Sequence, residues 1–217
     1  MLIFGIAMTE PDAGSDIAGF KTRATCRADG TWVLNGQKTY ISFGLIAELF
    51  FDDVELTPLH VIGDPARGFD YMRDGLAEER LGAATQSLPF AVEAIRLAIE
   101  FTTGRKAFGK HVSDFQNTKF KLAELRVEVD ATQALLDHCV RLHNAGKLDP
   151  ATAAVVKLKA SEVQARAVDE SLQLHGSAGY MREYPICQLY ADSRISRIFA
   201  GSSEIMKVVI AKDMLDS

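Results

Sequence analysis

Hydrophobic and polar residues follow two different patterns along the chain, and the change falls between Pro58 and Pro65. The first part has short runs rich in β-branched and aromatic residues, which are typical of strands: Lys21–Ala28, Thr31–Ser42 and Leu49–Phe51, the last ended by Asp52-Asp53. Asp29-Gly30 and Asn35-Gly36 are dipeptides that favour tight turns. We therefore expect three or four strands before residue 58, too few to form a stable sheet alone.

After Pro65 apolar residues recur every three or four positions, which predicts helices. We expect helices over residues 69–103 and 114–144, a third from the cap pair Asp149-Pro150 to about residue 175, and a shorter one after Ser202-Ser203-Glu204. The second helix has two apolar stripes, so we expect neighbours on more than one of its sides. The stripes are Phe120, Ala123, Val127, Ala131, Ala134 and His138, and Leu122, Leu125, Val129, Leu136 and Val140.

Long helices joined by short loops favour an antiparallel bundle. The predicted fold is α+β and predominantly helical, with a partial β domain over residues 1–58 and a four-helix bundle over residues 59–217. We expect no strand after residue 70 and no helix between residues 21 and 42.

Composition narrows the class of protein further. The 217 residues are 47% apolar and 24% charged, as in an ordinary globular chain. A net charge of −5 gives no basic excess to neutralise nucleic-acid phosphates, and no uncharged run is long enough to cross a bilayer. The three cysteines are odd in number and far apart (Cys26, Cys139, Cys187), which argues against a disulfide framework and fits a reducing compartment.

Three loops have residues that could contact a ligand, although each alone is more often structural. Residues 9–16 form a polar turn whose small residues would let backbone N–H groups approach an anion. Residues 105–110 place three basic groups and an aromatic ring before a helix. Residues 175–180 form a second small-residue loop, which by itself is more often a helix C-cap.

Other reactive residues give weaker patterns. His138, Cys139 and His143 lie close in the sequence, but their spacing does not place them on one helix face, so we expect no metal site. Cys187 has no adjacent histidine to mark it as a nucleophile, and Trp32 is expected in the core of a strand.

Together, in this order, six stretches make the chain resemble the acyl-CoA dehydrogenase family. They are residues 7–16 (AMTEPDAGSD), 34–42 (LNGQKTYIS), 48–54 (ELFFDDV), 105–110 (RKAFGK), 173–176 (QLHG) and 201–205 (GSSEI). The resemblance implies a flavoprotein that binds FAD and oxidises an acyl-CoA thioester to the trans-2-enoyl-CoA in fatty acid β-oxidation. It also implies an electron-transferring flavoprotein as acceptor, a dimer of dimers, and a location in the bacterial cytoplasm or the mitochondrial matrix.

The resemblance carries cofactor roles to individual positions. Thr9 would bond the pyrimidine edge of the flavin, and Ser42 would stand near flavin N5. Arg105, Phe108 and Gln116 would reach the FAD of a neighbouring subunit, and Ser177 stands where the family usually has a second glycine. The implied cofactor-binding residues are Met8, Thr9, Ser15, Tyr40, Ser42, Arg105, Phe108, Gln116, Gln173, Gly176, Ser177, Ser202 and Glu204.

The catalytic base can be assigned from two positions considered together. Most of the family has a glutamate just before the stretch at 201–205, where this chain has Ala200. A minority, the long-chain and isovaleryl types, has it on the first long helix before an Arg-Leu pair, and Glu79 matches that position. A solvated helix face is the alternative for Glu78 and Glu79; the loss at Ala200 favours Glu79 as the base. Substrate contacts are implied for Ser15, Glu78, Arg80, Ala200 and Gly201.

Two parts of the family pattern have no counterpart here. By the resemblance, we expect the N-terminal helical domain and, between Gly44 and Leu45, part of the middle β-barrel to be missing. Water would then enter the site and weaken its electrostatics. Three interpretations stay open: an acyl-CoA dehydrogenase or a piece of one, a non-catalytic remnant that assembles through its helices, and an acyl-CoA- or nucleotide-binding module without turnover.

Overall fold

The computed structural model describes residues 6–41 and 48–216. The chain divides into two compact units, residues 1–72 and residues 73–217, and the long helix α1 (Gly68–Gly104) begins in the first and continues through the second. The boundary expected from the sequence lay at residue 58.

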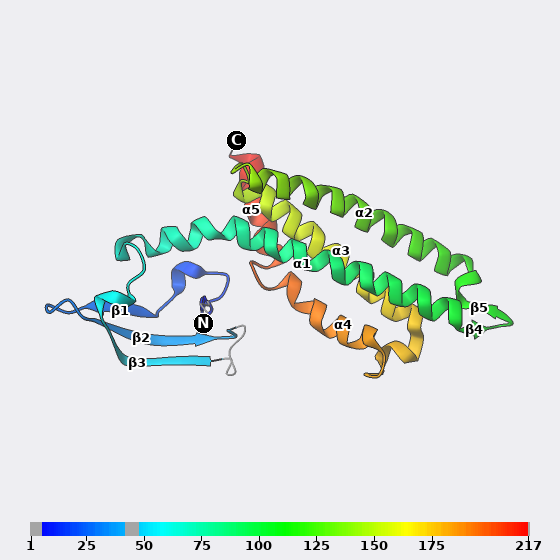
Figure 1. The fold of residues 1–217 in the computed structure, drawn as a ribbon, viewed down its shortest axis with the longest axis horizontal. Helices are drawn as coiled ribbons and strands as arrows, with labels where there is room; N and C mark the ends of the chain where they lie inside the picture. The colour runs from blue at the N-terminus through cyan, green and yellow to red at the C-terminus, as the bar shows by residue number, and fades with distance from the viewer. Residues whose placement is uncertain (1–5, 42–47, 217) are drawn as a thin grey trace. The chain divides into compact units, whose positions relative to one another are not determined.

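The N-terminal unit contains a three-stranded antiparallel sheet in the order β1-β2-β3 (Figure 1). The strands are β1 (Arg23–Cys26), β2 (Trp32–Thr39) and β3 (Glu48–Leu56). β1 and β2 are joined through the expected turn at Asp29-Gly30, where Gly30 has a φ of 83° and Asp29 accepts a hydrogen bond from the Thr31 N–H. Short 3-10 turns lie at Ile17–Gly19, Pro58–His60 and Pro65–Arg67.

The prediction of a second tight turn, at Asn35-Gly36, is wrong. Both residues lie inside β2, where the register with β3 shifts between Leu34 and Gly36. The Asn35 amide exchanges two hydrogen bonds with Asp53, which has a φ of 47°. The Asn-Gly pair therefore forms a bulge rather than a turn, and β3 continues through Asp52-Asp53 instead of ending there.

The expected helices are present in the C-terminal unit, and the predominantly helical fold class is confirmed. α2 spans Gln116–Asn144, α3 spans Pro150–His175 and α5 spans Ser203–Leu215. Asp149 caps α3 by accepting hydrogen bonds from the backbone N–H groups of Ala151 and Thr152. A further helix, α4 (Pro185–Ser193), was not predicted, although proline at its first turn and the Ile186–Leu189 spacing are signals for it. Short 3-10 turns lie at Val112–Asp114, Gly176–Tyr180 and Arg194–Arg197.

The expectation of no strand after residue 70 is also wrong. Two-residue strands, β4 (Lys106–Ala107) and β5 (Lys110–His111), pair between α1 and α2. The two residues between them, Phe108 and Gly109, have φ values of 51° and 81°. Positive φ at both central positions matches the natural twist of a β-hairpin. The segment that was expected to be a loop therefore forms a small two-stranded hairpin.

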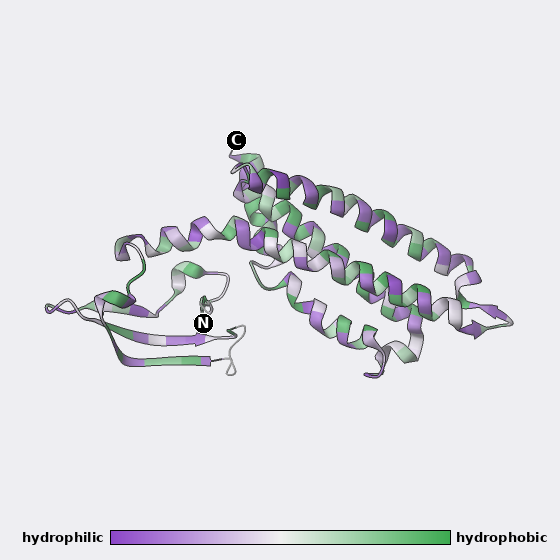
Figure 2. Cartoon of the chain, in the orientation of Figure 1, coloured by the Kyte–Doolittle hydropathy of each residue, from purple (hydrophilic) through white to green (hydrophobic). Residues whose placement is uncertain are grey.

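The core of the helical unit is built mainly by α1, α2 and α3, which lie side by side in Figure 1. Two clusters of buried residues join all three helices, and a third joins α1 and α3 to Ile186 of α4. Figure 2 shows hydrophobic and hydrophilic residues alternating along each helix, as expected for helices with one buried face. On α2, Leu125, Val129 and Leu136 are buried, whereas Phe120 and Val127 are exposed. Within the described chain the stripe of α2 that begins at Phe120 is therefore not covered.

Candidate active site

The loop that follows residue 8 is anchored to the end of β2. The Met8 carbonyl accepts a hydrogen bond from the Lys38 ammonium at 2.8 Å, and the Thr9 carbonyl accepts one from the Thr39 N–H at 2.9 Å. Glu10 and Ala13 exchange two backbone hydrogen bonds, which close the loop into a tight turn. Three residues with predicted cofactor roles, Met8, Thr9 and Tyr40, are thereby gathered at one end of the sheet.

Glu10 holds this loop together with a buried carboxylate, and sequence reasoning gave it no role. Its side chain is 5% exposed. It accepts hydrogen bonds from the Lys21 N–H at 2.6 Å, the Thr22 N–H at 3.0 Å and the Lys38 ammonium at 2.8 Å. Burial by itself raises the pKa of this carboxyl, but the bonds from Lys38, Lys21 and Thr22 outweigh it and lower the pKa to about 2.

The outer side of the same loop is exposed to solvent. Gly14 and Ser15 are exposed, and no hydrogen bond between described residues uses their backbone N–H groups. Tyr40 is 80% exposed, with a φ of 55°. Free N–H groups and a hydroxyl suit phosphate oxygens or the polar edge of a ring. Ser42 lies outside the described residues.

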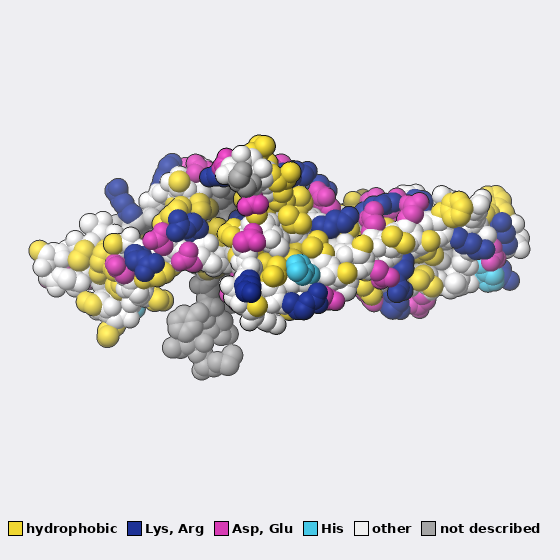
Figure 3. Space-filling model, turned by 90° about the horizontal axis from the view of Figure 1, so that it is seen from above, with side chains coloured by type: hydrophobic (Ala, Val, Ile, Leu, Met, Phe, Trp, Pro, Cys, Tyr) yellow, Lys and Arg dark blue, Asp and Glu magenta, His cyan; other side chains and the backbone are white. Residues whose placement is uncertain are grey.

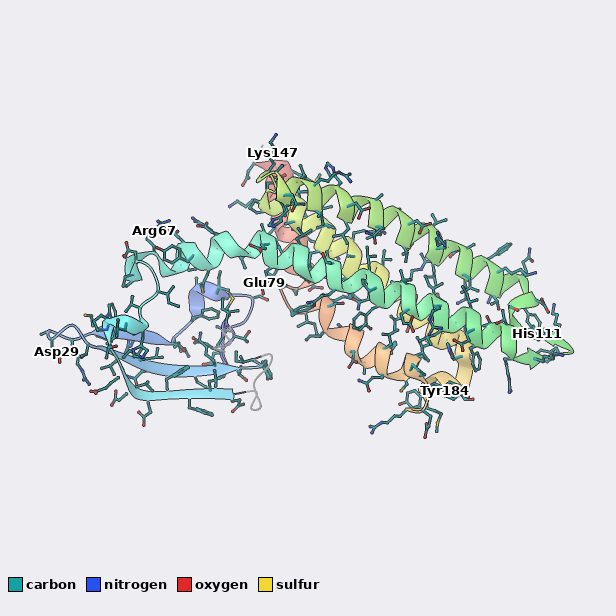
Figure 4. The ribbon with its side chains drawn as sticks, in the orientation of Figure 1. Asp29, Arg67, Glu79, His111, Lys147 and Tyr184 are labelled. Carbon is teal, nitrogen blue, oxygen red and sulfur yellow. The ribbon has the colours of Figure 1, made fainter. Side chains whose placement is uncertain are left out.

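In the helical unit, Glu78 and Glu79 are both exposed on α1, where Figure 4 labels Glu79. Arg80, expected to contact substrate, is 7% exposed instead. One guanidinium nitrogen donates to the Pro150 carbonyl at 3.3 Å, and its buried Nε has no partner among the described residues. Burial lowers the pKa of Arg80, and the nearby charge of Glu79 opposes that shift.

Ala200 and Gly201 form a left-handed turn immediately before α5. Their φ values are 53° and 87°, and Ser202 then caps the helix by accepting a hydrogen bond from the Ile205 N–H at 3.4 Å. A left-handed conformation costs an alanine about 1–2 kcal/mol. Glu204 lies in the first turn of α5, where its own N–H and the Ser202 hydroxyl lower its pKa.

Lys157 of α3 lies beneath this turn. It is 1% exposed, and its ammonium donates to the Gly201 carbonyl at 2.6 Å. Burial, helped by the charge of Arg80 and opposed by that of Glu204, lowers the pKa of Lys157 to about 8. The positive charges of Arg80, next to Glu79 on α1, and of Lys157, beneath the Ala200–Gly201 turn, therefore lie close enough to repel each other.

The remaining predicted cofactor residues lie around the junctions that follow α1 and α3. Phe101 of α1 stacks on His175, the last residue of α3, with ring centroids 4.4 Å apart. This contact brings the hairpin after α1 close to the loop after α3. The predicted cofactor residues on these two segments and at the ends of the neighbouring helices are all exposed: Arg105, Phe108, Gln116, Gln173, Gly176 and Ser177.

Lys157 is the residue whose role in the helical unit the sequence analysis missed. A signal for it exists, because Lys157 lies at helical spacing with Ala153, Ala160 and Gln164, all of which are buried. A lysine in a small-residue stripe is unusual, since lysines are almost never fully buried unless paired.

The surface adds little to the list of candidate sites. Figure 3 shows basic and acidic side chains interleaved over the visible face of the helical unit, without a continuous basic patch. Among the described residues, no group of three His, Cys, Asp or Glu side chains could hold a metal ion. None of the described helices is long and apolar enough to cross a membrane.

Two protein-family models match the chain. The model for the acyl-CoA dehydrogenase C-terminal domain matches residues 66–215, and that for the middle domain of the same family matches residues 5–55. The mitochondrial long-chain specific acyl-CoA dehydrogenase of Rattus norvegicus is 35% identical over an alignment of 265 positions, which covers 98% of this chain and 61% of the rat protein. Because that alignment is longer than the chain, the rat protein has internal residues without a counterpart here.

Solved structures agree with these matches. The acyl-CoA dehydrogenase of Geobacillus kaustophilus has a TM-score of 0.94 at 32% identity, covering 97% of this chain and 68% of that one. A glutaryl-CoA dehydrogenase from Mycobacterium smegmatis, solved in complex with FADH2, has a TM-score of 0.87 at 25% identity, covering 97% and 65%. The chain spans about six tenths of the length of the rat protein.

Proposed function

This chain belongs to the acyl-CoA dehydrogenase family, and we propose that it takes part in the FAD-dependent α,β-dehydrogenation of an acyl-CoA thioester to the trans-2-enoyl-CoA. The observation that carries the proposal is that a glutamate stands at position 79 on α1 while an alanine stands at position 200 before α5. The position that usually holds the family's carboxylate has none, and the alternative position has one. The left-handed turn at Ala200–Gly201 is formed although residue 200 has no carboxylate.

The residues present fit FAD. The free N–H groups of Gly14 and Ser15 and the hydroxyl of Thr9 suit the flavin edge or the pyrophosphate. Gly176 has a φ of 59°, and a side-chain carbon placed there would meet nothing within 4 Å, which leaves room for close approach of a ligand after α3. Bound FAD would supply the hydride acceptor for the β-carbon.

Residues of this chain would remove the proton from the α-carbon. Glu79 would abstract it as general base, and the Ala200 N–H would donate to the thioester oxygen, where negative charge develops. An amide N–H can do this whatever side chain it carries, so the replacement of glutamate by Ala200 leaves that donor in place. Exclusion of water would raise the basicity of Glu79.

The partners proposed for this activity are an electron-transferring flavoprotein, to accept the electrons, and further copies of this chain. The resemblance places Arg105, Phe108 and Gln116 at a neighbouring subunit's FAD, and all three are exposed in this chain.

Anaerobic bleaching of the flavin by acyl-CoA tests the assignment of Glu79. Glu79→Gln keeps the shape and removes the base, so the rate of bleaching should fall by a factor of roughly 10² to 10⁴ while FAD and acyl-CoA still bind. Glu100→Gln is the matched control, because it changes another exposed carboxylate of α1 for which no contact with substrate is predicted, and it should leave the rate nearly unchanged.

A second variant tests the two-position argument. Ala200→Glu in the Glu79→Gln background restores a carboxylate at the usual family position and should recover part of the rate. Equal rates for wild type and Glu79→Gln would mean that the base lies elsewhere. A flavin-loaded wild type that no acyl chain length bleaches would contradict the proposed activity and favour a binding or assembly role.

A further inference from the structure

The ammonium of Lys157 occupies an unfavourable place for a charge. It is buried on the inner face of α3 beside Val156 and Ala160, and among the described residues it has one hydrogen-bond partner, the Gly201 carbonyl. Arg80, itself buried, lies near enough to repel it. The charge of Glu204 attracts the ammonium in turn. A buried charge whose hydrogen-bond partner is neutral is nevertheless a poor source of stability, so its presence needs another explanation.

The segment that Lys157 holds is strained and closely packed. Ala200 and Gly201 are left-handed in succession, and a side-chain carbon on Gly201 would lie 2.5 Å from the Met206 Cε. On the far side of the turn, Ser202 begins α5 as its cap. With the Gly201 carbonyl fixed from below and Ser202 fixed to the helix, the orientation of the preceding Ala200 N–H is restricted as well.

We propose that Lys157 is a positioning residue, which holds the Ala200–Gly201 turn so that the Ala200 N–H is aimed at the thioester oxygen of the substrate. The inference rests on the proposed function, in which that N–H is the oxygen donor. Lys157 is buried beneath the turn and does not touch the substrate itself. It acts through the backbone that it anchors.

The first test needs neither flavin nor substrate. Lys157→Met in the full chain keeps the length of the side chain and removes the donor, and amide hydrogen exchange of residues 199–203 should then accelerate by about tenfold or more. Lys159→Met is the matched control, because Lys159 lies two residues away on α3 and is exposed, and it should leave exchange of this segment unchanged. Unaltered exchange in Lys157→Met overturns the proposal.

The second test separates positioning from a merely structural role. The FAD-loaded chain is titrated with an acyl-CoA thioester and with the S-alkyl-CoA thioether of equal length, which lacks the carbonyl oxygen. Wild type should prefer the thioester, and Lys157→Met should lose about fivefold to tenfold of that preference, the factor of one hydrogen bond. Affinity for the thioether should not change, and Lys157→Arg, which keeps a cationic donor, should recover part of the preference.

The outcomes are distinguishable. A Lys157→Met chain that retains the thioester preference, or a wild type without one, overturns the positioning role. A wild type that prefers the thioester but is not bleached by it contradicts the proposed function alone. If Lys157→Met loses its helical circular dichroism, Lys157→Gln, a neutral donor one atom shorter, takes its place in both tests, with an intermediate effect expected.

Discussion

At the residue scale, Glu10 makes the stability of the N-terminal unit depend on pH. Its folded-state pKa of about 2 is below the ordinary 4.5, so the charged carboxylate stabilises the N-terminal unit at every pH above 4.5. This stabilisation is lost as the pH falls from 4.5 toward 2, because the unfolded chain takes up the proton first. The shift corresponds to about 3 kcal/mol.

We expect Glu10→Gln to lower the free energy of unfolding of the N-terminal unit at pH 6 and to have little further effect at pH 2. Trp32, the chain's single tryptophan, lies on β2 of that unit, so its fluorescence during urea unfolding reports the change. Glu48→Gln, at an exposed carboxylate on β3, is the control and should be nearly neutral at both values. A Glu10→Gln effect that does not depend on pH would contradict this account.

At the scale of elements, the bulge in β2 depends on a glycine. Gly36 has a φ of 148°, and a side-chain carbon there would lie 2.6 Å from the Thr22 Cα, a backbone atom that cannot move aside cheaply. Gly36→Ala should therefore destabilise the N-terminal unit by roughly 2–4 kcal/mol, measured by Trp32 fluorescence. Gly30→Ala meets nothing within 4 Å and should cost about 1–2 kcal/mol from its left-handed backbone alone. Equal losses for the two variants would mean that close packing at Gly36 is unimportant.

The same elements show where sequence reasoning succeeds. The long helices were predictable because cap residues such as Asp149 and sustained apolar spacing act locally and repeatedly. Asn35-Gly36 was misassigned because the same dipeptide serves a turn or a bulge, and only the partner strand decides which. The hairpin at Phe108-Gly109 was missed because two-residue strands have no periodicity to detect.

At the scale of the whole molecule, motifs in the sequence predict roles for residues that would contact ligands, and they predict none for the residues that support them. The predicted ligand contacts include Glu79, Thr9 and Ser15. Glu10 and Lys157 support the predicted site from the interior, and their hydrogen-bond partners, which are backbone groups and the Lys38 ammonium, lie at least eleven residues away in the sequence. Such partners depend on how the chain folds back on itself, which no local pattern records.

The exposed stripe on α2 leads to an expectation about assembly. Phe120 and Val127 are 57% and 68% exposed, and burial of such side chains between copies would stabilise an oligomer. Light scattering should give a molar mass above the 23.7 kDa of one chain. Val127→Glu should lower that mass, whereas Gln133→Glu, an exposed polar position on the same helix, should not. A monodisperse monomer at micromolar concentration would contradict the expectation.

The left-handed backbone at Ala200 has an evolutionary consequence. Its conformation is fixed by Gly201, Ser202 and the lysine below, so every residue with a Cβ suffers about the same strain there. An exchange between glutamate and alanine at this position is then nearly neutral for the fold. A lineage that already had a carboxylate on α1 could lose the one at residue 200, or regain it, by single substitutions without passing through an unfolded intermediate. Under the proposed function, the catalytic base could thus move between α1 and the turn before α5 while the backbone of that turn stayed unchanged.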